Sequence, residues 1–210
     1  MPVDQTSRAQ PNKRSAEASE RDEWLRLVWR STLGTLDSRW LVFVDEMGTH
    51  TSLAPLYAYS PRGKRAFFKV PRNRGKNTTL LASMGWEGMS PSMAVEGSTT
   101  KEVFETYIEH FLTPALRPGQ VVVMDNLGAH KGERVRELIQ SKGCKLLYLP
   151  PYSPDLNPIE EAFAKVKALL RRAGARAREA LMEAIGRALG AVTTQDARSF
   201  FEHCGYCLPG

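Results

Sequence analysis

Short apolar runs that end in polar residues alternate along this chain with longer stretches of helical spacing. Three of these runs predict strands buried on both faces, at residues 40–46 (WLVFVDE), 121–125 (VVVMD) and 145–149 (KLLYL). Two more strands are expected at residues 78–85 and 91–96, with a turn between them. The strands of the predicted sheet are therefore spread over most of the chain.

A turn signal separates two other short runs. Residues 60–63 (SPRG) place Pro and Gly between residues 56–59 and residues 65–70. This pattern is typical of a tight turn between two strands, so we expect a β-hairpin here.

Helical spacing marks the N-terminal part of the chain. Residues 16–31 predict an amphipathic helix with Trp24, Leu27 and Val28 on one side. We expect this helix to pack on the outside of the domain or against an upstream part of a longer product.

Helices are also expected between and after the strands. Thr99 and Glu102 form a capping-box pattern, which predicts a helix that runs to Leu112. Three more helices are expected, at residues 132–141, 177–192 and 195–203. Strands alternating with helices indicate an α/β fold, a mixed sheet flanked by helices.

The stretch from Pro150 to Arg172 predicts a stiff loop that leads into a helix. Prolines restrict the backbone of the loop and of the helix start, at Pro150, Pro151, Pro154 and Pro158. Asn157 is a favoured N-cap residue, and Pro158 suits the first helical position. An apolar stripe at helical spacing follows, formed by Ile159, Phe163, Val166 and Leu170. Glu160 borders this stripe, near the start of the helix.

Composition narrows the possible partners and locations of the protein but does not predict its function. The net charge of +6 and the isoelectric point near 9.3 suggest a polyanionic partner. We find no signal peptide and no apolar stretch near the roughly 18 residues that span a bilayer, so we expect no membrane role and a cytoplasmic location. Cys204 and Cys207 form a C-x-x-C close to the chain end, where neither a zinc site nor a redox motif is expected.

Three acidic residues stand where the predicted elements begin or end. Asp45 and Asp125 each close a buried strand, and Glu160 lies in the first turn of a helix. A buried carboxylate is costly unless it is paired or binds a cation, and ligands of open α/β sheets gather at the carboxyl ends of the strands. If the two strands are neighbours, the aspartates repel each other unless a hard cation such as Mg²⁺ or Mn²⁺ lies between them. The pattern therefore predicts a three-carboxylate site for phosphodiester chemistry with two ions about 4 Å apart.

Each acid also has a structural interpretation, and two acids are rivals for the metal role. Either aspartate could be a turn residue that ends a strand, and Glu160 could belong to a capping box. Glu46 is expected on the opposite strand face from Asp45. Glu161 lies four residues before Lys165, which favours an exposed ion pair.

The same residues resemble the mariner-type DDE transposases and their bacterial insertion-sequence relatives. The matching pieces are VDEMG at 44–48, VVMDNLGAH at 122–130 and LPPYSPDLNPIEEAF at 149–163. Residues 126–159, thirty-four in all, separate Asp125 from Glu160, which is the family spacing when its third acid is Glu.

This resemblance implies a ribonuclease-H-like fold with Asp45, Asp125 and Glu160 as the catalytic triad that binds Mg²⁺ or Mn²⁺. It implies cleavage of double-stranded DNA at transposon ends and strand transfer into target DNA, by a homodimer in the DNA complex. Asn126 and His130 match the DN…H pattern of the family and are expected to support the site. A structural role for the histidine is a nearly equal alternative.

A DNA-binding surface is expected to be basic. Lysines and arginines crowd the predicted hairpin and the loop after it, at Arg62, Lys64, Arg65, Lys69, Arg72, Arg74 and Lys76. Gly63 and Gly75 allow close backbone approach, which favours phosphate contacts over a solvated charge run. The helix after Pro158 extends this surface with Lys165, Lys167, Arg171 and Arg172.

The resemblance also divides the chain. It covers about Trp40 to Arg172, so we expect residues 39–210 to form the catalytic domain with its C-terminal helices. Members of the family usually carry an N-terminal helix-turn-helix region, for which residues 1–38 are too few. We expect these residues to be a linker or the remnant of an upstream DNA-binding region. Two alternatives stay open, a ribonuclease-H-like nuclease without strand transfer and a non-catalytic DNA-binding remnant.

Overall fold

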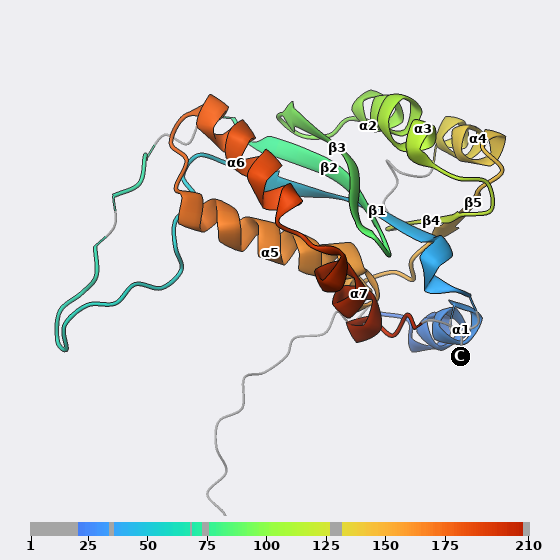
Figure 1. Cartoon of the computed structure of the whole chain (residues 1–210), viewed down its shortest axis with the longest axis horizontal. Coiled ribbons are helices and arrows are strands. Elements are labelled where there is room, and N and C mark those ends of the chain that lie inside the picture. The colour runs from blue at the N-terminus through green and yellow to red at the C-terminus, as the bar shows by residue number, and fades with distance from the viewer. Residues whose placement is uncertain (1–20, 34–35, 68, 73–75, 127–131, 208–210) are drawn as a thin grey trace, which may run out of the picture.

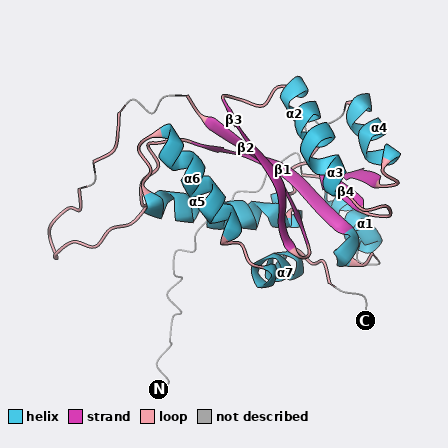
Figure 2. Ribbon diagram, turned by 45° about the horizontal axis from the view of Figure 1, so that its top comes forward, coloured by secondary structure: helices cyan, strands magenta, loops and turns pink. Residues whose placement is uncertain are grey.

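The computed structural model describes residues 21–33, 36–67, 69–72, 76–126 and 132–207. These residues fold into one mixed sheet with helices on both faces (Figures 1 and 2).

The sheet has five strands in the order β3-β2-β1-β4-β5. Their bounds are β1 Leu41–Thr49, β2 Thr78–Gly85, β3 Gly88–Glu96, β4 Val121–Met124 and β5 Lys145–Tyr148. The strands β1, β2 and β3 pair antiparallel, whereas β4 lies parallel to both β1 and β5. The central strand β1 therefore joins an antiparallel half to a parallel half.

Two groups of helices cover the two faces of this sheet. The bounds on one side are α1 Glu23–Leu33, α5 Pro158–Ala173, α6 Arg178–Gly190 and α7 Thr194–His203. The other side holds α2 Lys101–Tyr107, a π-helical turn at Ile108–Leu112, α3 Thr113–Ala115 and α4 Glu133–Ser141. Short 3-10 turns lie at Ser38–Trp40 and Pro154–Leu156.

Alternation along β1 divides the core in two. Phe43 and Met47 pack with α5, α6 and α7, while Val42 and Val44 pack with α2 and α4. The expected stripe of α5 is confirmed, because Ile159, Phe163, Val166 and Leu170 are all buried. Asp45 lies two residues from both Phe43 and Met47, so its side chain projects to the same face of the sheet, the one that α5 covers.

The predicted β-hairpin at residues 56–70 is wrong. The described part of this segment contains no strand, and in Figures 1 and 2 it extends away from the body of the domain. Tyr57, Tyr59 and Phe67 are almost fully exposed. A two-stranded hairpin with nothing to pack against is marginal in water, so the turn signal at Pro61 and Gly63 has no sheet to support.

The N-terminal helix faces the domain with a different side from the one expected. Trp24, Leu27 and Val28 are exposed, whereas Arg26 and Leu33 are buried. The inward side is fixed by polar contacts of Arg26 and Trp29, which apolar periodicity cannot detect.

Three smaller expectations also need correction. The helix expected from Thr99 has Thr100 as its N-cap instead, and its side chain accepts from the Val103 N–H. The β3 strand starts earlier than expected and includes Pro91, which an edge strand tolerates because its outer N–H groups need no partner. The predicted third buried strand, β5, is also an edge strand and is only partly buried.

Two glycines, one at the end of a helix and one inside a helix, give a matched test of the helix assignments. Gly174 ends α5 with φ 58° and donates to Leu170 O, so an alanine there must adopt a left-handed backbone. Gly186 lies inside α6, and an added Cβ would meet no atom within 4 Å. We expect Gly174→Ala to lower the free energy of unfolding by about 1 kcal/mol and Gly186→Ala to raise it by about 0.5–1 kcal/mol. Urea unfolding measures both, and changes of the same sign would contradict these helix assignments.

Candidate active site

Asp45 and Asp125 emerge at neighbouring positions on the carboxyl edge of the parallel half-sheet. Val44 pairs with Met124 in the β1–β4 register, and each aspartate is the next residue of its chain segment. Because β4 ends at Met124 while β1 continues to Thr49, the strands part here. This is the position where open α/β sheets bind ligands.

Glu160 reaches the same place from α5. A cavity of about 480 Å³ is lined by Asp45, Asp125, Glu160, Asn126, Asn157 and residues 149–154. The structure therefore brings together the three acids singled out from the sequence, and Asn126 with them. Glu46 is not among the lining residues, as strand alternation predicts.

The three carboxylates differ in exposure. Asp45 is only 7% exposed, Asp125 is half-buried and Glu160 is exposed. Asp45 Oδ1 accepts a hydrogen bond from the Glu46 N–H at 2.7 Å, and Asp45 Oδ2 accepts one from Asn157 Nδ2 at 2.7 Å. Both oxygens of the most buried acid are thus held by N–H donors, which fixes the orientation of its carboxylate.

Asn157 has a role that the sequence interpretation missed. It occupies the N-cap position of α5 as expected, but its side chain makes no capping hydrogen bond. Its Nδ2 bonds Asp45 instead, and among the described residues no donor reaches the buried Asn157 Oδ1. An unsatisfied buried polar atom costs about 1–3 kcal/mol. The capping signal is all that local sequence offers at this position, so the contact with Asp45 needed the structure.

The donor set of the cavity fits a hard divalent cation. Three carboxylates and the amides supply oxygen ligands, as Mg²⁺ and Mn²⁺ prefer, and no Cys or His of the described ranges lines the cavity. Among the described residues, no three His, Cys, Asp or Glu side chains lie close enough to hold a single ion. The acids share one cavity without forming a tight cluster.

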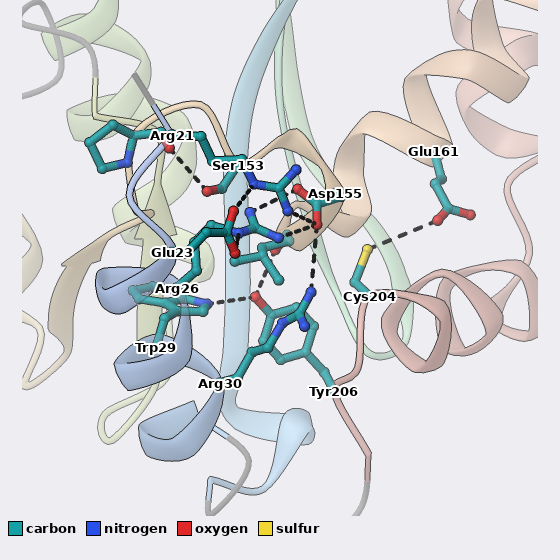
Figure 3. A network of polar contacts seen from close by, with 12 residues as sticks. Arg21, Glu23, Arg26, Trp29, Arg30, Ser153, Asp155, Glu161, Cys204 and Tyr206 are labelled. Carbon is teal, nitrogen blue, oxygen red and sulfur yellow. Dashed lines mark hydrogen bonds and ion pairs between the residues drawn. The ribbon is translucent and has the colours of Figure 1, made fainter. Parts of the chain in front are cut away.

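An ion pair fixes the loop that carries these residues. Arg26 of α1, 2% exposed, donates from Nη1 to Asp155 Oδ1 at 2.9 Å and from Nη2 to Oδ2 at 2.5 Å. Arg21 and Arg30 each have a guanidinium nitrogen 3.7 Å from Asp155 Oδ2. The hydrogen bonds from Arg26 are the main reason that the pKa of Asp155 lies below its usual value. Figure 3 shows the three arginines around this carboxylate.

The C-terminal segment holds the same turn from another side. The Tyr206 hydroxyl donates to Leu156 O at 2.7 Å and accepts from Trp29 Nε1 at 2.9 Å (Figure 3). Leu156 immediately precedes Asn157, so the turn is tied to α1 and to the residues after α7. Neither contact was predicted.

Tyr152 adds strain to the same loop. It lines the cavity, is 59% exposed and has φ 52°, the only positive φ at a non-glycine position among the described residues. The left-handed conformation is disfavoured for residues with a Cβ, and such outliers cluster at functional sites.

Glu161 and the C-terminal cysteines have structural contacts. The predicted Glu161–Lys165 ion pair is wrong, because Lys165 Nζ bonds Asp196 Oδ2 and Glu161 Oε1 lies 2.5 Å from His203 Nδ1. Both partners come from α7, so tertiary contact replaces the local pair. Burial raises the pKa of Cys204 to about 12, which leaves its thiol protonated, and Cys207 is exposed.

The predicted DNA-binding residues lie in two places. All described members of the first set are exposed on the segment before β2, and they comprise Arg62, Lys64, Arg65, Lys69, Arg72 and Lys76. Of these, Lys76 lies 3.1 Å from Glu96 Oε1. Lys167 and Arg171 are partly buried on α5. His130 and Arg74 lie outside the described residues.

A larger cavity, of about 800 Å³, lies away from the acids. It is lined by Arg39, Trp86 and Gln120 among others, at the amino end of β4. Glu87 is the single carboxylate among its described lining residues, and Arg198 lies 3.3 Å from it. The donor set for divalent metal therefore belongs to the smaller cavity.

Known structures share this architecture. The catalytic domain of Mos1 mariner transposase matches with a TM-score of 0.61 and 15% identity, over 93% of this chain and 91% of that chain. A pre-cleavage Mos1 transpososome matches with a TM-score of 0.73 and 15% identity, over 95% of this chain and 64% of that one. The Mos1 mariner paired end complex with Mn matches with a TM-score of 0.70 and 16% identity, over 96% of this chain and 63% of that one. This chain thus spans less than two-thirds of the transposase chains in the two complexes.

The sheet order, its helical layers and this likeness define a ribonuclease-H-like domain. The family model of the DDE superfamily endonucleases matches residues 40–182, most of the chain, and this protein belongs to that family. A comparison with curated proteins gives no match. None of the described helices is both long and apolar enough to cross a membrane.

The Arg26–Asp155 pair predicts an asymmetry between two variants. In Asp155→Asn the buried Arg26 loses its bidentate anionic partner and keeps the Glu23 carboxylate, 3.5 Å from its Nε, whereas in Arg26→Met the half-exposed Asp155 can be hydrated. We expect Asp155→Asn to cost about 1–2 kcal/mol at pH 7, less than a fully buried pair, and Arg26→Met to cost less than that. Urea unfolding measures both, and the reverse order would show that burial of Arg26 does not set the cost.

The same pair has a pH signature. Because folding lowers the pKa of Asp155, its stabilisation is complete above the usual value of 3.8 and is lost as the pH falls below it. The difference in unfolding free energy between wild type and Asp155→Asn should therefore shrink as the pH falls below about 4. Glu183→Gln, at an exposed pair with Arg187, is the control and should change stability by less than about 0.5 kcal/mol.

Proposed function

We propose that this protein is a transposase catalytic domain of the bacterial insertion-sequence branch. It cleaves element ends and transfers the cut strand into target DNA. The observation that carries the proposal is the single cavity lined by Asp45, Asp125 and Glu160 at the carboxyl edge of the sheet. Family membership supports the endonuclease step. Residues 39–210 are the catalytic unit in this proposal. Residues 1–38 are a linker or the remnant of an upstream DNA-binding region, and their helix α1 packs on that unit through Arg26 and Trp29.

The three acids are the residues that would hold Mg²⁺ or Mn²⁺. Two bound ions would supply Lewis-acid activation of the attacking oxygen and stabilisation of the leaving oxygen. Mos1 paired end complexes solved with Mn and with Mg are among the similar structures, which supports this choice of ion. Asp45 is held in one orientation because N–H partners bind both of its oxygens. Glu160 also lines the cavity and is the most exposed of the three acids, so its carboxylate would be accessible to a phosphodiester.

DNA would lie across the exposed basic segment before β2 and along α5. Arg62, Lys64 and Arg65 are exposed there and can neutralise phosphates. The solved relatives include transposase complexes with transposon ends, which supports double-stranded DNA as the partner. Two DNA ends would require a second copy of the chain.

The second candidate is a nuclease that cuts without joining. It is favoured by the description of the matched family, which names an endonuclease. A strand-transfer assay with pre-cleaved ends separates the two. Joined product supports the transposase, and hydrolysis alone supports the nuclease.

Asp125→Asn tests the metal role of the second acid. Loss of one metal carboxylate should reduce nicking by roughly 100-fold or more, and it should abolish the rise in melting temperature that Mn²⁺ gives the wild type. Without metal, the variant should melt at the wild-type temperature or higher, because repulsion between acids is relieved. Unfolding of the metal-free variant would count against a metal role.

Glu160 and Glu161 give a matched pair of neighbours. Glu160→Gln should lose nicking as Asp125→Asn does, since its carboxylate lines the cavity. Glu161→Gln should nick like the wild type, because Glu161 contacts His203 on α7 instead. Equal damage in a gel-based nicking assay would show that the wrong glutamate was assigned.

Salt dependence tests the DNA surface. Replacing Arg62, Lys64 and Arg65 with Ala should reduce the slope of log affinity against log salt by roughly one unit for each phosphate that is no longer neutralised. The control replaces Arg117, Lys142 and Lys145, which are exposed at the opposite edge of the parallel strands. Fluorescence anisotropy with duplex DNA measures both, and equal slopes would place the DNA elsewhere.

A further inference from the structure

We propose that Asn157 is a positioning residue that orients the Asp45 carboxylate for cation binding. This inference rests on the proposed function, because it assigns Asn157 a purpose only if Asp45 holds a metal. Asn157 and Asp45 lie 112 positions apart in the sequence, and their side chains meet at 2.7 Å beside the cavity.

The contact is suited to orientation because both side chains are held in the interior. Asn157 is 3% exposed and Asp45 is 7% exposed. A carboxylate only accepts hydrogen bonds, so the amide must present its NH₂ group to Asp45. With Glu46 N–H on Oδ1 and Asn157 N–H on Oδ2, rotation of the carboxylate breaks at least one bond. Each oxygen has more than one lone pair, so a cation can share it with the N–H donor.

Helix capping alone does not explain this asparagine. Its side chain makes no capping bond to the start of α5, and its Oδ1 has no partner among the described residues. Ser would cap the helix as well and would bury a smaller polar group. The contact that Asn makes and Ser cannot make is the one to Asp45.

The backbone on both sides of Asn157 is fixed. The Tyr206 hydroxyl donates to the Leu156 carbonyl on one side of Asn157, and the ring of Pro158 fixes φ on the other side. The amide is thereby presented to Asp45 from a rigid segment. Ligand-orienting groups of this kind typically contribute about 10–100-fold to metal affinity or activity.

Replacing Asn157 with Ser in the full chain separates a role in orienting Asp45 from a role in capping α5. We expect Mn²⁺ affinity, measured by isothermal titration, to fall roughly 10-fold and nicking to fall roughly 10–100-fold. The Mn²⁺ concentration for half-maximal nicking should rise by the same factor as the Mn²⁺ affinity falls. The melting temperature without metal should stay within about 4 °C of wild type, because the wild-type side chain makes no capping bond to lose and Ser is a favoured N-cap residue.

The matched control is Thr100→Ala, which removes the N-cap of α2 away from the cavity. It should lower the melting temperature and leave Mn²⁺ affinity unchanged, the opposite signature. If Asn157→Ser does not fold, Asn157→Leu replaces it, since Leu has a similar shape but no donor for Asp45. Nicking by Asn157→Leu at saturating Mn²⁺ should also fall at least roughly 10-fold.

The outcomes distinguish this inference from the proposed function. Wild-type Mn²⁺ affinity and nicking in Asn157→Ser, or wild-type nicking in Asn157→Leu, would overturn the positioning role and leave the proposed function standing. A folded wild-type chain that neither binds Mn²⁺ nor nicks DNA would overturn both. Weakened Mn²⁺ binding at an unchanged melting temperature supports the inference.

Discussion

The buried guanidinium of Arg26 and the carboxylate of Asp155 fix the part of the chain on which the candidate site depends. The turn that carries Asp155 also offers the Leu156 carbonyl to Tyr206, so both terminal regions of the domain hold one short turn. Asn157 follows at once, and Glu160 lies one helical turn later. A shift of this turn would therefore move the amide on Asp45 and the third acid together. The N-terminal helix and the C-terminal residues shape the site without supplying a ligand from their described parts.

Around this site the fold departs from several local preferences. A carboxylate is almost fully buried, a helix begins without a side-chain cap, and Tyr152 has a left-handed backbone. Each departure costs stability by itself, and together they surround one cavity. Such concentrations of unfavourable local features are expected where a structure is shaped by chemistry as well as by stability.

Sequence patterns predicted the strands and helices that have strong periodicity and a core to pack on. The stripe of α5 and the run at β1 were confirmed because apolar burial alone determines them. The hairpin before β2 failed because turn residues cannot show whether a sheet is present to receive the strands. The inward side of α1 was wrong because Arg26 and Trp29 bind polar partners more than one hundred positions away. Motif spacing placed the three acids on one cavity, but the partner that orients Asp45, Asn157, looked like an ordinary cap.

The central place of β1 has a consequence for biosynthesis. Its parallel neighbour β4 begins at Val121, long after β1 has left the ribosome. Until then one edge of an apolar strand displays open backbone groups, a surface on which nascent chains pair with one another. A product that terminated before that point would lack Asp125 and Glu160 and keep an aggregation-prone edge. Pairing of β4 thus covers this open edge in the same step that brings Asp125 next to Asp45.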